Sequence, residues 1–433
     1  MKKVVVSADP REGVDLHLVP GKNFTTGVKP FAERFGPPTS IEEDLLTVAS
    51  SIYVTDLAVL RGPAENYIRD IDLTIEVVNV HAFERVKDDI LHALIVLSND
   101  NWTLNFTPKP GQVEPMLPWE EKEGAALLFS GGLDSFSGAA RLLREGKPLL
   151  LVSHTTHNRV VEDSQQALLE VLRRHFNHPF ERVPFRVFGR TQGEFKFPAE
   201  EERENSQRTR SFLFLALGAL SARRVGYHRI LNIAENGQFA IHLPLSAARV
   251  GPFSTHTAHP EFVHHMEKLL RVLLNSDSLT IENPYLYMTK AEVVADLGAE
   301  LFGDIAASVS CWKASRVKAG FKHCGACVPC ISRRISLEHL NIRLAEYQRD
   351  LFNEQVDDLP PDDIGKRNLS DLSQFIARFR GYVPQRKDDL LEVFFELYND
   401  HFDQDRVIEM YARFSREAYG VLSKYPALSR MVR

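Results

Sequence analysis

The sequence predicts an α/β protein built around a doubly wound parallel sheet. From Gly124 onward, short continuous apolar segments alternate with longer segments whose apolar residues recur at helical spacing. Strands of a parallel sheet have this appearance because helices cover both of its faces. The first apolar segment, AALLF at 125–129, runs directly into the glycine-rich SGGLDS at 130–135. Ligands of such sheets bind at the carboxyl ends of the strands, so this turn is the expected site.

The elements of this central region are expected in βα order. Each predicted strand is a short apolar segment, and each predicted helix is a longer amphipathic one. They are, in order, strands at 125–129, 148–153, 184–188 and 229–234, and helices over 134–145, about 163–175 and about 206–225.

The regions on either side differ in pattern. Residues 1–120 predict a small α+β accessory domain with strand-like segments at 46–62, 69–78 and 102–108, a helix over 86–97 and a linker over 107–124. It holds no catalytic cluster, which favours a structural or docking role. After about Ser336 the strand signals end, and residues 341–433 predict a helical C-terminal region. The middle domain is expected over 121–340.

Composition removes several classes of function. The 433 residues include 52 Lys and Arg and 58 Asp and Glu, a formal charge of −6. A general nucleic-acid partner is not expected, because such proteins usually carry a basic excess. The apolar stretch at 212–220 is too short to span a bilayer, and the N-terminus lacks the apolar core of a signal peptide, so we expect a cytoplasmic protein without a membrane partner.

The turn at 130–135 has the residues of a phosphate cradle. Gly131 and Gly132 let the backbone approach an anion closely. The N–H groups of the turn and the N-terminus of the following helix carry partial positive charge that attracts the anion. Ser130 and Ser135 add hydroxyl donors, and Leu133 completes the segment. We assign Asp134 to Mg²⁺, because its charge would otherwise repel phosphate. No Walker-type GxxxxGK[ST] motif occurs.

All four cysteines lie in one short segment. Cys311, Cys324, Cys327 and Cys330 supply four thiolates with two CxxC spacings, enough for one tetrahedral zinc ion. An iron–sulfur cluster could use the same four ligands. A catalytic zinc would need an open coordination position, so we interpret the site as a structural zinc knuckle.

Together, SGGLDS and the later cysteine pattern resemble the 7-cyano-7-deazaguanine synthases, which are PP-loop ATP pyrophosphatases with an adenine-nucleotide alpha hydrolase-like fold. Further segments match in the same order. Arg210 takes the place of the arginine at a family helix start, HPEF at 259–262 stands where the family has RPEF, and Lys290 and Glu292 fall in a shared T-K-x-E segment. The asparagine that follows the family arginine is Ser211 here.

The resemblance implies a function for about residues 124–337. Such an enzyme uses ATP and Mg²⁺ to adenylate a carboxylate, 7-carboxy-7-deazaguanine or an analogue, with release of pyrophosphate, and an amine then attacks to give an amide, a nitrile or a conjugate. Asp134, Arg210 and Lys290 are the implied catalytic residues, with Arg210 neutralising charge at the phosphates. Enlarged relatives occur in anti-phage defence operons, which implies a defence role and a protein acceptor or defence-complex partner.

Two other functions remain open. The chain could be a non-catalytic ATP-binding scaffold of a defence complex. An enzyme would release pyrophosphate from ATP, whereas a scaffold would not. It could also be a PP-loop tRNA-modifying enzyme, although it has neither a basic excess nor a cysteine outside the cluster. His256, His264 and His265 are interpreted as surface or pocket-lining groups.

Overall fold

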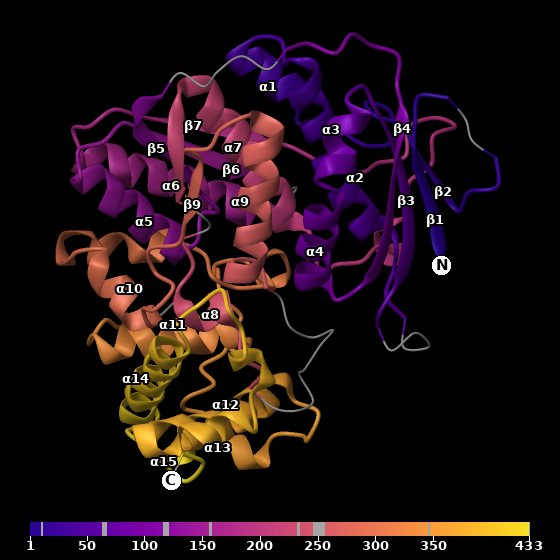
Figure 1. The fold of residues 1–433 in the computed structure, drawn as a ribbon. Coiled ribbons are helices and arrows are strands. Elements are labelled where there is room, and N and C mark those ends of the chain that lie inside the picture. The colour runs from indigo at the N-terminus through magenta and orange to yellow at the C-terminus, as the bar shows by residue number, and fades with distance from the viewer. Residues whose placement is uncertain are drawn as a thin grey trace.

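The computed structural model describes residues 1–9, 12–62, 67–115, 121–155, 158–231, 234–245, 256–344 and 347–432. Two parallel sheets stand side by side, and a helical region lies beneath the second of them (Figure 1). None of the described helices combines the length and the apolar character that a membrane span requires.

The second sheet confirms the predicted doubly wound α/β fold. It has five parallel strands in the order β7-β6-β5-β8-β9, so the chain leaves the central strand β5 in one direction and later returns to its other side. The elements of this region are β5 (Lys122–Leu128), α5 (Leu133–Arg144), β6 (Leu149–His154), α6 (Arg159–His175), β7 (Phe180–Phe185), α7 (Arg210–Val225), β8 (Tyr227–Leu231), α8 (Gly237–Ile241), α9 (Pro260–Leu274), β9 (Thr280–Glu282), α10 (Lys290–Asp296) and α11 (Val328–His339).

Alternate residues of the strands face two separate cores. Ala126 and Leu128 of β5 pack with α7 and α9, whereas Ala125 and Leu127 pack with α5 and α6. All four are buried, because side chains of a strand alternate between its faces and helices cover both. The reversal of strand order at β5 places the turn after this strand at the usual ligand position of the fold.

The first region also contains a sheet, and its strands run parallel in the order β2-β1-β3-β4. The α+β organisation expected for residues 1–120 is therefore wrong in detail, since helices connect parallel strands as in an α/β unit. Its elements are β1 (Lys2–Val6), β2 (Leu16–Leu18), α1 (Val28–Phe35), α2 (Ser40–Ala58), β3 (Asp70–Val77), α3 (Val80–Arg85), α4 (Lys87–Ser98) and β4 (Asn101–Pro108).

The strand-like segment expected at 46–62 lies mostly in helix α2. This helix is buried on all of its sides, so the sequence lacks the polar stripe that marks the solvent face of an amphipathic helix. Its β-branched residues, which are common in strands, made the segment resemble a strand. A capping box between Thr39 and Glu42 starts it: the Thr39 N–H donates to Glu42 Oε2 at 2.8 Å. The expected strands at 69–78 and 102–108 and the helix over 86–97 are confirmed as β3, β4 and α4.

The C-terminal region is helical, as predicted, but less continuously. Residues 342–344 and 347–355 form no helix, and a bridge joins Tyr347 to His323. The segment 392–403, after α13, contains a single short helical turn at Phe395–Leu397 and otherwise no regular element. The helices present are α12 (Ile364–Arg380), α13 (Lys387–Leu391), α14 (Gln404–Leu422) and α15 (Pro426–Ser429).

The first region and the five-stranded sheet share one hydrophobic core. Helices α2 and α4 pack against α7 and α9, and one continuous apolar cluster reaches from Val4 in β1 to Ile281 in β9. The domain limits at 120 and 340 stay predictions. Residues 116–120 of the expected linker lie outside the described residues.

Candidate functional site

The phosphate loop at 130–135 lies where strand β5 is followed by helix α5. Gly131 has a φ of +85°, the left-handed region that favours glycine. Gly132 is the N-cap of α5 in an extended conformation, and the first N–H groups of a helix have no partner inside it. Leu133 buries its side chain and offers the loop only its backbone. The loop therefore gathers N–H groups at a helix N-terminus, an arrangement that binds phosphate.

The loop is anchored from two other segments. The Gly131 carbonyl accepts hydrogen bonds from the Val309 N–H at 3.0 Å and from the Ser164 hydroxyl at 2.9 Å. The hydroxyls of Ser130 and Ser135 lie 3.2 Å apart, close enough to act on the same anion. The anchors fix the loop before any ligand arrives, and a preorganised site loses less entropy on binding.

A Gly131→Ala variant is expected to bind ATP at least about tenfold more weakly. Its Cβ would lie 2.9 Å from the Gln165 Cγ atom, and the positive φ adds strain of about 1–2 kcal/mol. Calorimetry with ATP and Mg²⁺ measures the effect. The control is Gly420→Ala, in a helix where the added Cβ meets nothing within 4 Å. Equal ATP affinity in the Gly131 variant would show that the loop conformation does not matter.

Asp134, in the first turn of α5, is buried and paired with a lysine. Its Oδ1 atom accepts a hydrogen bond from Lys290 Nζ at 2.6 Å, and its Oδ2 atom accepts one from Asn236 Nδ2 at 2.8 Å. Burial by itself would raise the pKa of Asp134, but the Lys290 charge and the hydrogen bonds around the carboxylate outweigh it and lower the pKa. Asp134 is therefore an anion held inside the protein.

A second carboxyl group, Glu235, stands beside Asp134, and the sequence analysis missed it. Burial and the negative charge of Asp134 raise the pKa of Glu235 well above its usual value. Glu235 and Asn236 follow strand β8, the neighbour of β5, so the carboxyl ends of both strands meet here. The position of Glu235 directly after a predicted strand was the feature of the sequence that could have identified it. Mg²⁺ prefers carboxylate oxygens, and a bound cation would favour loss of the proton from Glu235, so Asp134 together with a deprotonated Glu235 fits the predicted ion.

Lys290 is held in place at the start of α10. Thr289 is the N-cap, its N–H donates to Glu292 Oε2 at 2.8 Å, and the Glu292 N–H donates back to its hydroxyl at 3.2 Å. The T-K-x-E segment is thus a capping box that presents the lysine. The Lys290 N–H also donates to Gln238 Oε1 at 2.6 Å, and only 5% of the residue is exposed.

The C-terminal helix α14 touches this cap through Glu417. Its Oε1 atom accepts from the Thr289 hydroxyl at 2.9 Å, while its Oε2 atom is buried without a hydrogen-bond partner among the described residues. Burial is the main cause that raises the pKa of Glu417 to about 7. The folded state therefore favours the protonated side chain, and the stability this provides is lost as the pH rises from 4.5 through 7.

A Glu417→Gln variant is expected to flatten this pH dependence. The amide is neutral at every pH, so the variant should melt roughly a few °C above the unchanged protein at pH 8 and close to it at pH 5. Thermal melts between pH 5 and 8 measure the difference. Glu409→Gln, an exposed change on the same helix, is the control. A variant that melts lower than the unchanged protein at pH 8 would contradict the protonated state.

Arg210 begins helix α7, and among the described residues no hydrogen bond or ion pair joins it to Asp134 or Lys290. Its guanidinium lies over the Phe214 ring, 5.2 Å from the centroid. Burial, followed by the charge of Arg210, lowers the pKa of His154 to about 3, so this imidazole at the end of β6 stays neutral. Tyr53 of α2 packs its ring against His154 with centroids 5.3 Å apart. The first region thus contributes a side chain to the carboxyl edge of the sheet.

The four cysteine sulfurs converge as predicted. The Sγ atoms of Cys311, Cys324, Cys327 and Cys330 all lie within 4.8 Å of one another. The Cys311–Cys327 and Cys324–Cys330 sulfurs are each 3.9 Å apart, close to the about 3.8 Å that a tetrahedral ion with 2.3 Å bonds requires. The residues therefore fit zinc. Two residues before Cys311, Val309 anchors Gly131, so the knuckle and the phosphate loop are directly connected.

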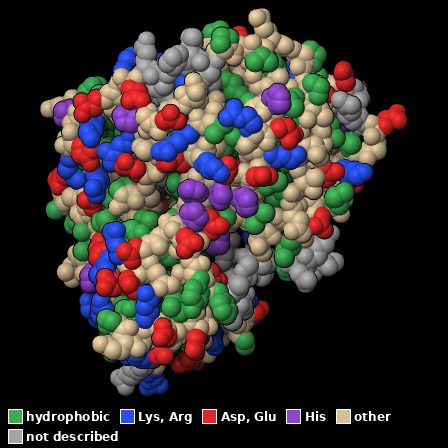
Figure 2. Space-filling model, viewed as in Figure 1, with side chains coloured by type: hydrophobic (Ala, Val, Ile, Leu, Met, Phe, Trp, Pro, Cys, Tyr) green, Lys and Arg blue, Asp and Glu red, His purple; other side chains and the backbone are tan. Residues whose placement is uncertain are grey.

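Histidine side chains gather on one face of the molecule (Figure 2). His264 is exposed with its ring 4.7 Å from that of His401, and His265 Nδ1 lies 3.0 Å from an oxygen of Asp89. His256 is half-buried and donates to a backbone carbonyl of α4. In the described part of the chain no hydrogen bond joins these three histidines to the phosphate loop.

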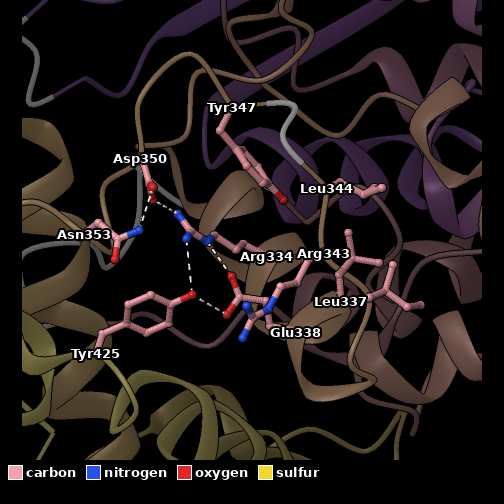
Figure 3. A pocket seen from close by; sticks show the side chains of 10 residues that line it. Arg334, Leu337, Glu338, Arg343, Leu344, Tyr347, Asp350, Asn353 and Tyr425 are labelled. Atoms are coloured by element: carbon pink, nitrogen blue, oxygen red, sulfur yellow. Dashed lines mark hydrogen bonds and ion pairs between the residues drawn. The ribbon is translucent and has the colours of Figure 1, made fainter.

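A cavity of about 350 Å³ lies between α11 and the segment that follows it (Figure 3). Arg334 points into its centre and is already paired with Glu338, Asp350 and the Tyr425 hydroxyl. The cavity contains no residue of the phosphate loop, and its central cation is neutralised. We therefore place the candidate site at the carboxyl edge of the sheet.

The chain is similar in sequence to several known proteins. A family model described as queuosine biosynthesis protein QueC matches residues 253–341, which include Lys290 and the cysteines. A 7-cyano-7-deazaguanine synthase of Sulfolobus acidocaldarius is 24% identical over 242 residues, 52% of this chain and 47% of that relative.

Two further relatives match over most of their length. A 7-cyano-7-deazaguanine synthase 1 of Colwellia psychrerythraea is 25% identical over 228 residues, 51% of this chain and 95% of the relative. A 7-cyano-7-deazaguanine synthase of Pseudoalteromonas translucida is 25% identical over 227 residues, 50% and 94% respectively. The chain spans about half the length of the Sulfolobus relative and nearly all of the other two.

Proposed function

Because this chain is a QueC-like PP-loop protein, we propose that it adenylates a carboxylic acid with ATP and transfers the acyl group to an amine. The acid is 7-carboxy-7-deazaguanine or a close analogue, since the relatives are named for the corresponding nitrile. The observation that carries the proposal is the buried Asp134–Lys290 pair beside an anchored phosphate loop.

The first half of the reaction forms the acyl-adenylate. A carboxylate oxygen of the acid attacks the α-phosphorus of ATP, and pyrophosphate leaves with the electrons of the broken P–O bond. The loop N–H groups and the hydroxyls of Ser130 and Ser135 bind the departing phosphates, while Lys290 and Arg210 neutralise the developing charge. Asp134 and Glu235 would hold Mg²⁺, which would supply further neutralisation of the phosphate charge.

The second half uses the adenylate as a leaving group. An amine attacks the acyl carbon, AMP departs and one proton is released, which leaves an amide. With ammonia as the amine, a second ATP activates the amide oxygen, and loss of AMP and a proton gives the nitrile. With an amine on a macromolecule, the same first round gives a conjugate.

The regions at 1–120 and 341–433 favour a macromolecular acceptor and a role in anti-phage defence. Both regions contact the site, through Tyr53 and Glu417, and both lie outside the residues matched by the family model. An enzyme that only joins a small acid to ammonia would not need two additional regions of this size.

Incubation with ATP, Mg²⁺ and 7-carboxy-7-deazaguanine, with and without ammonia, tests the proposal. We expect acid-dependent release of pyrophosphate, and mass spectrometry of all products then identifies the acceptor. A free nitrile without any protein adduct would overturn the conjugation step and leave nitrile synthesis.

If ATP binds without release of pyrophosphate, the chain is the ATP-binding scaffold that the sequence left open. If release depends on added tRNA in place of the acid, it is a tRNA-modifying enzyme.

A further inference from the structure

A second cavity, of about 90 Å³, lies next to the candidate site. Helix α8 forms one wall, Trp312 and α11 form another, and the C-terminal helices α12 and α14 close it. The cavity is connected to the reaction centre through Gln238, whose Oε1 atom accepts from the Lys290 N–H at 2.6 Å. Lys290 in turn holds Asp134, so a group bound here lies one residue away from the proposed phosphate chemistry.

Two buried polar atoms of the cavity wall lack partners among the described residues. They are the Nε2 donor of Gln238 and the hydroxyl of Ser332, in residues that are 8% and 5% exposed. A buried polar group without a hydrogen bond costs about 1–3 kcal/mol. Both atoms belong to residues that line the same cavity, which points to a ligand that provides their partners.

Most of the remaining wall is made of aromatic and aliphatic side chains. Phe239, Trp312, Phe375 and Phe414 line the cavity, and the last two belong to the C-terminal helices. Flat rings stack on such side chains. The space is several times what one water molecule needs, so it has room for part of a planar ring.

Helix α14 also positions the polar wall. The Tyr411 hydroxyl donates to the Gln238 carbonyl at 3.1 Å and accepts from the Leu243 N–H at 3.0 Å, which ties the start of α8 and the segment just after it to α14. Neither α12 nor α14 lies within residues 253–341, so this half of the cavity is separate from the matched family segment. The C-terminal region therefore builds a binding wall that the matched segment does not supply.

We propose that this cavity binds the planar heteroaromatic ring of the acid, with Gln238 and Ser332 as specificity-determining residues. The inference rests on the proposed function and names where its substrate binds. An oxygen or ring nitrogen of the heterocycle accepts from Gln238 Nε2, and the Ser332 hydroxyl pairs with a neighbouring atom of the same edge. The aromatic side chains exclude water from the ring, and the carboxylate of the acid extends toward Asp134 and Lys290.

Calorimetry with 7-carboxy-7-deazaguanine as the probe tests the assignment. Ser332→Ala is expected to weaken binding of the acid about tenfold and to leave the affinity for ATP and Mg²⁺ unchanged. The control is Ser336→Ala, one turn further along α11, whose hydroxyl donates to the Ser332 carbonyl and does not line the cavity. A second variant, Leu372→Trp, fills the cavity and is expected to abolish binding of the acid while ATP still binds.

The outcomes separate the two proposals. If the acid binds both variants as tightly as the unchanged protein, the cavity assignment is overturned, whatever the pyrophosphate assay gives. If the acid binds in the expected pattern but no pyrophosphate is released, the ring site stands and the proposed function fails. Benzoic acid in place of the heterocycle should not bind, and binding of both with equal affinity would overturn the role of the two polar residues.

Discussion

Asp134→Asn is expected to slow pyrophosphate release about a thousandfold while the protein stays folded. The amide keeps the size of the side chain but cannot hold Mg²⁺ with a negative charge, and it leaves the Lys290 ammonium without its counterion. Charge stabilisation of this kind is worth roughly 3–4 kcal/mol in a buried site. A coupled assay for pyrophosphate measures the rate, and a thermal melt confirms the fold.

The matched control for this variant is Asp163→Asn, an exposed aspartate on α6. It makes the same chemical change away from the loop and should retain the full rate. A rate in the Asp134 variant within tenfold of the unchanged protein would remove Asp134 from the catalytic group.

Cys324→Ser is expected to cause the largest loss of stability. Three thiolates hold zinc more weakly than four, and structural zinc sites contribute on the order of 10 kcal/mol to folding at neutral pH. Val309, two residues before Cys311, anchors the phosphate loop, so ATP affinity should fall together with zinc content. We expect the melting temperature to drop by about 10 °C or more and ATP binding to fall below detection.

Metal analysis of the purified protein accompanies these measurements. Lys318→Ala, an exposed change within the same cysteine-rich segment, should keep zinc, stability and ATP affinity. Full ATP affinity in a zinc-free Cys324 variant would show that ATP binding by the phosphate loop does not depend on the zinc knuckle. Absorbance near 400 nm with bound iron would identify an iron–sulfur cluster in place of zinc.

The central sheet was predictable because its signals are local. The apolar segments at 125–129 and 149–153 are buried on both faces of the sheet, and glycine-rich or polar turns border them. The first region was harder, since β3 alternates in burial as an antiparallel strand would, and nothing within one strand reveals the direction of its neighbour. Residues 46–58 were misread because burial on every side of α2 removes the helical period.

The candidate site was predictable where a motif carries it. The loop at 130–135 and the four cysteines were found at their positions in the chain, whereas Glu235 was not, because it becomes part of the site only when β8 pairs with β5. Arg210 matched by resemblance, whereas its charge interaction with His154 became visible only in the structure. Which side chains converge depends on sheet order, and sheet order depends on contacts between residues far apart in sequence.

The apolar cluster that extends from Val4 to Ile281 means that the two sheets are not independent modules. Removing residues 1–120 would uncover the apolar sides of α7 and α9 that pack against α2 and α4, so the truncated protein is expected to aggregate. Residues 1–120 and the second sheet are therefore expected to fold as one unit.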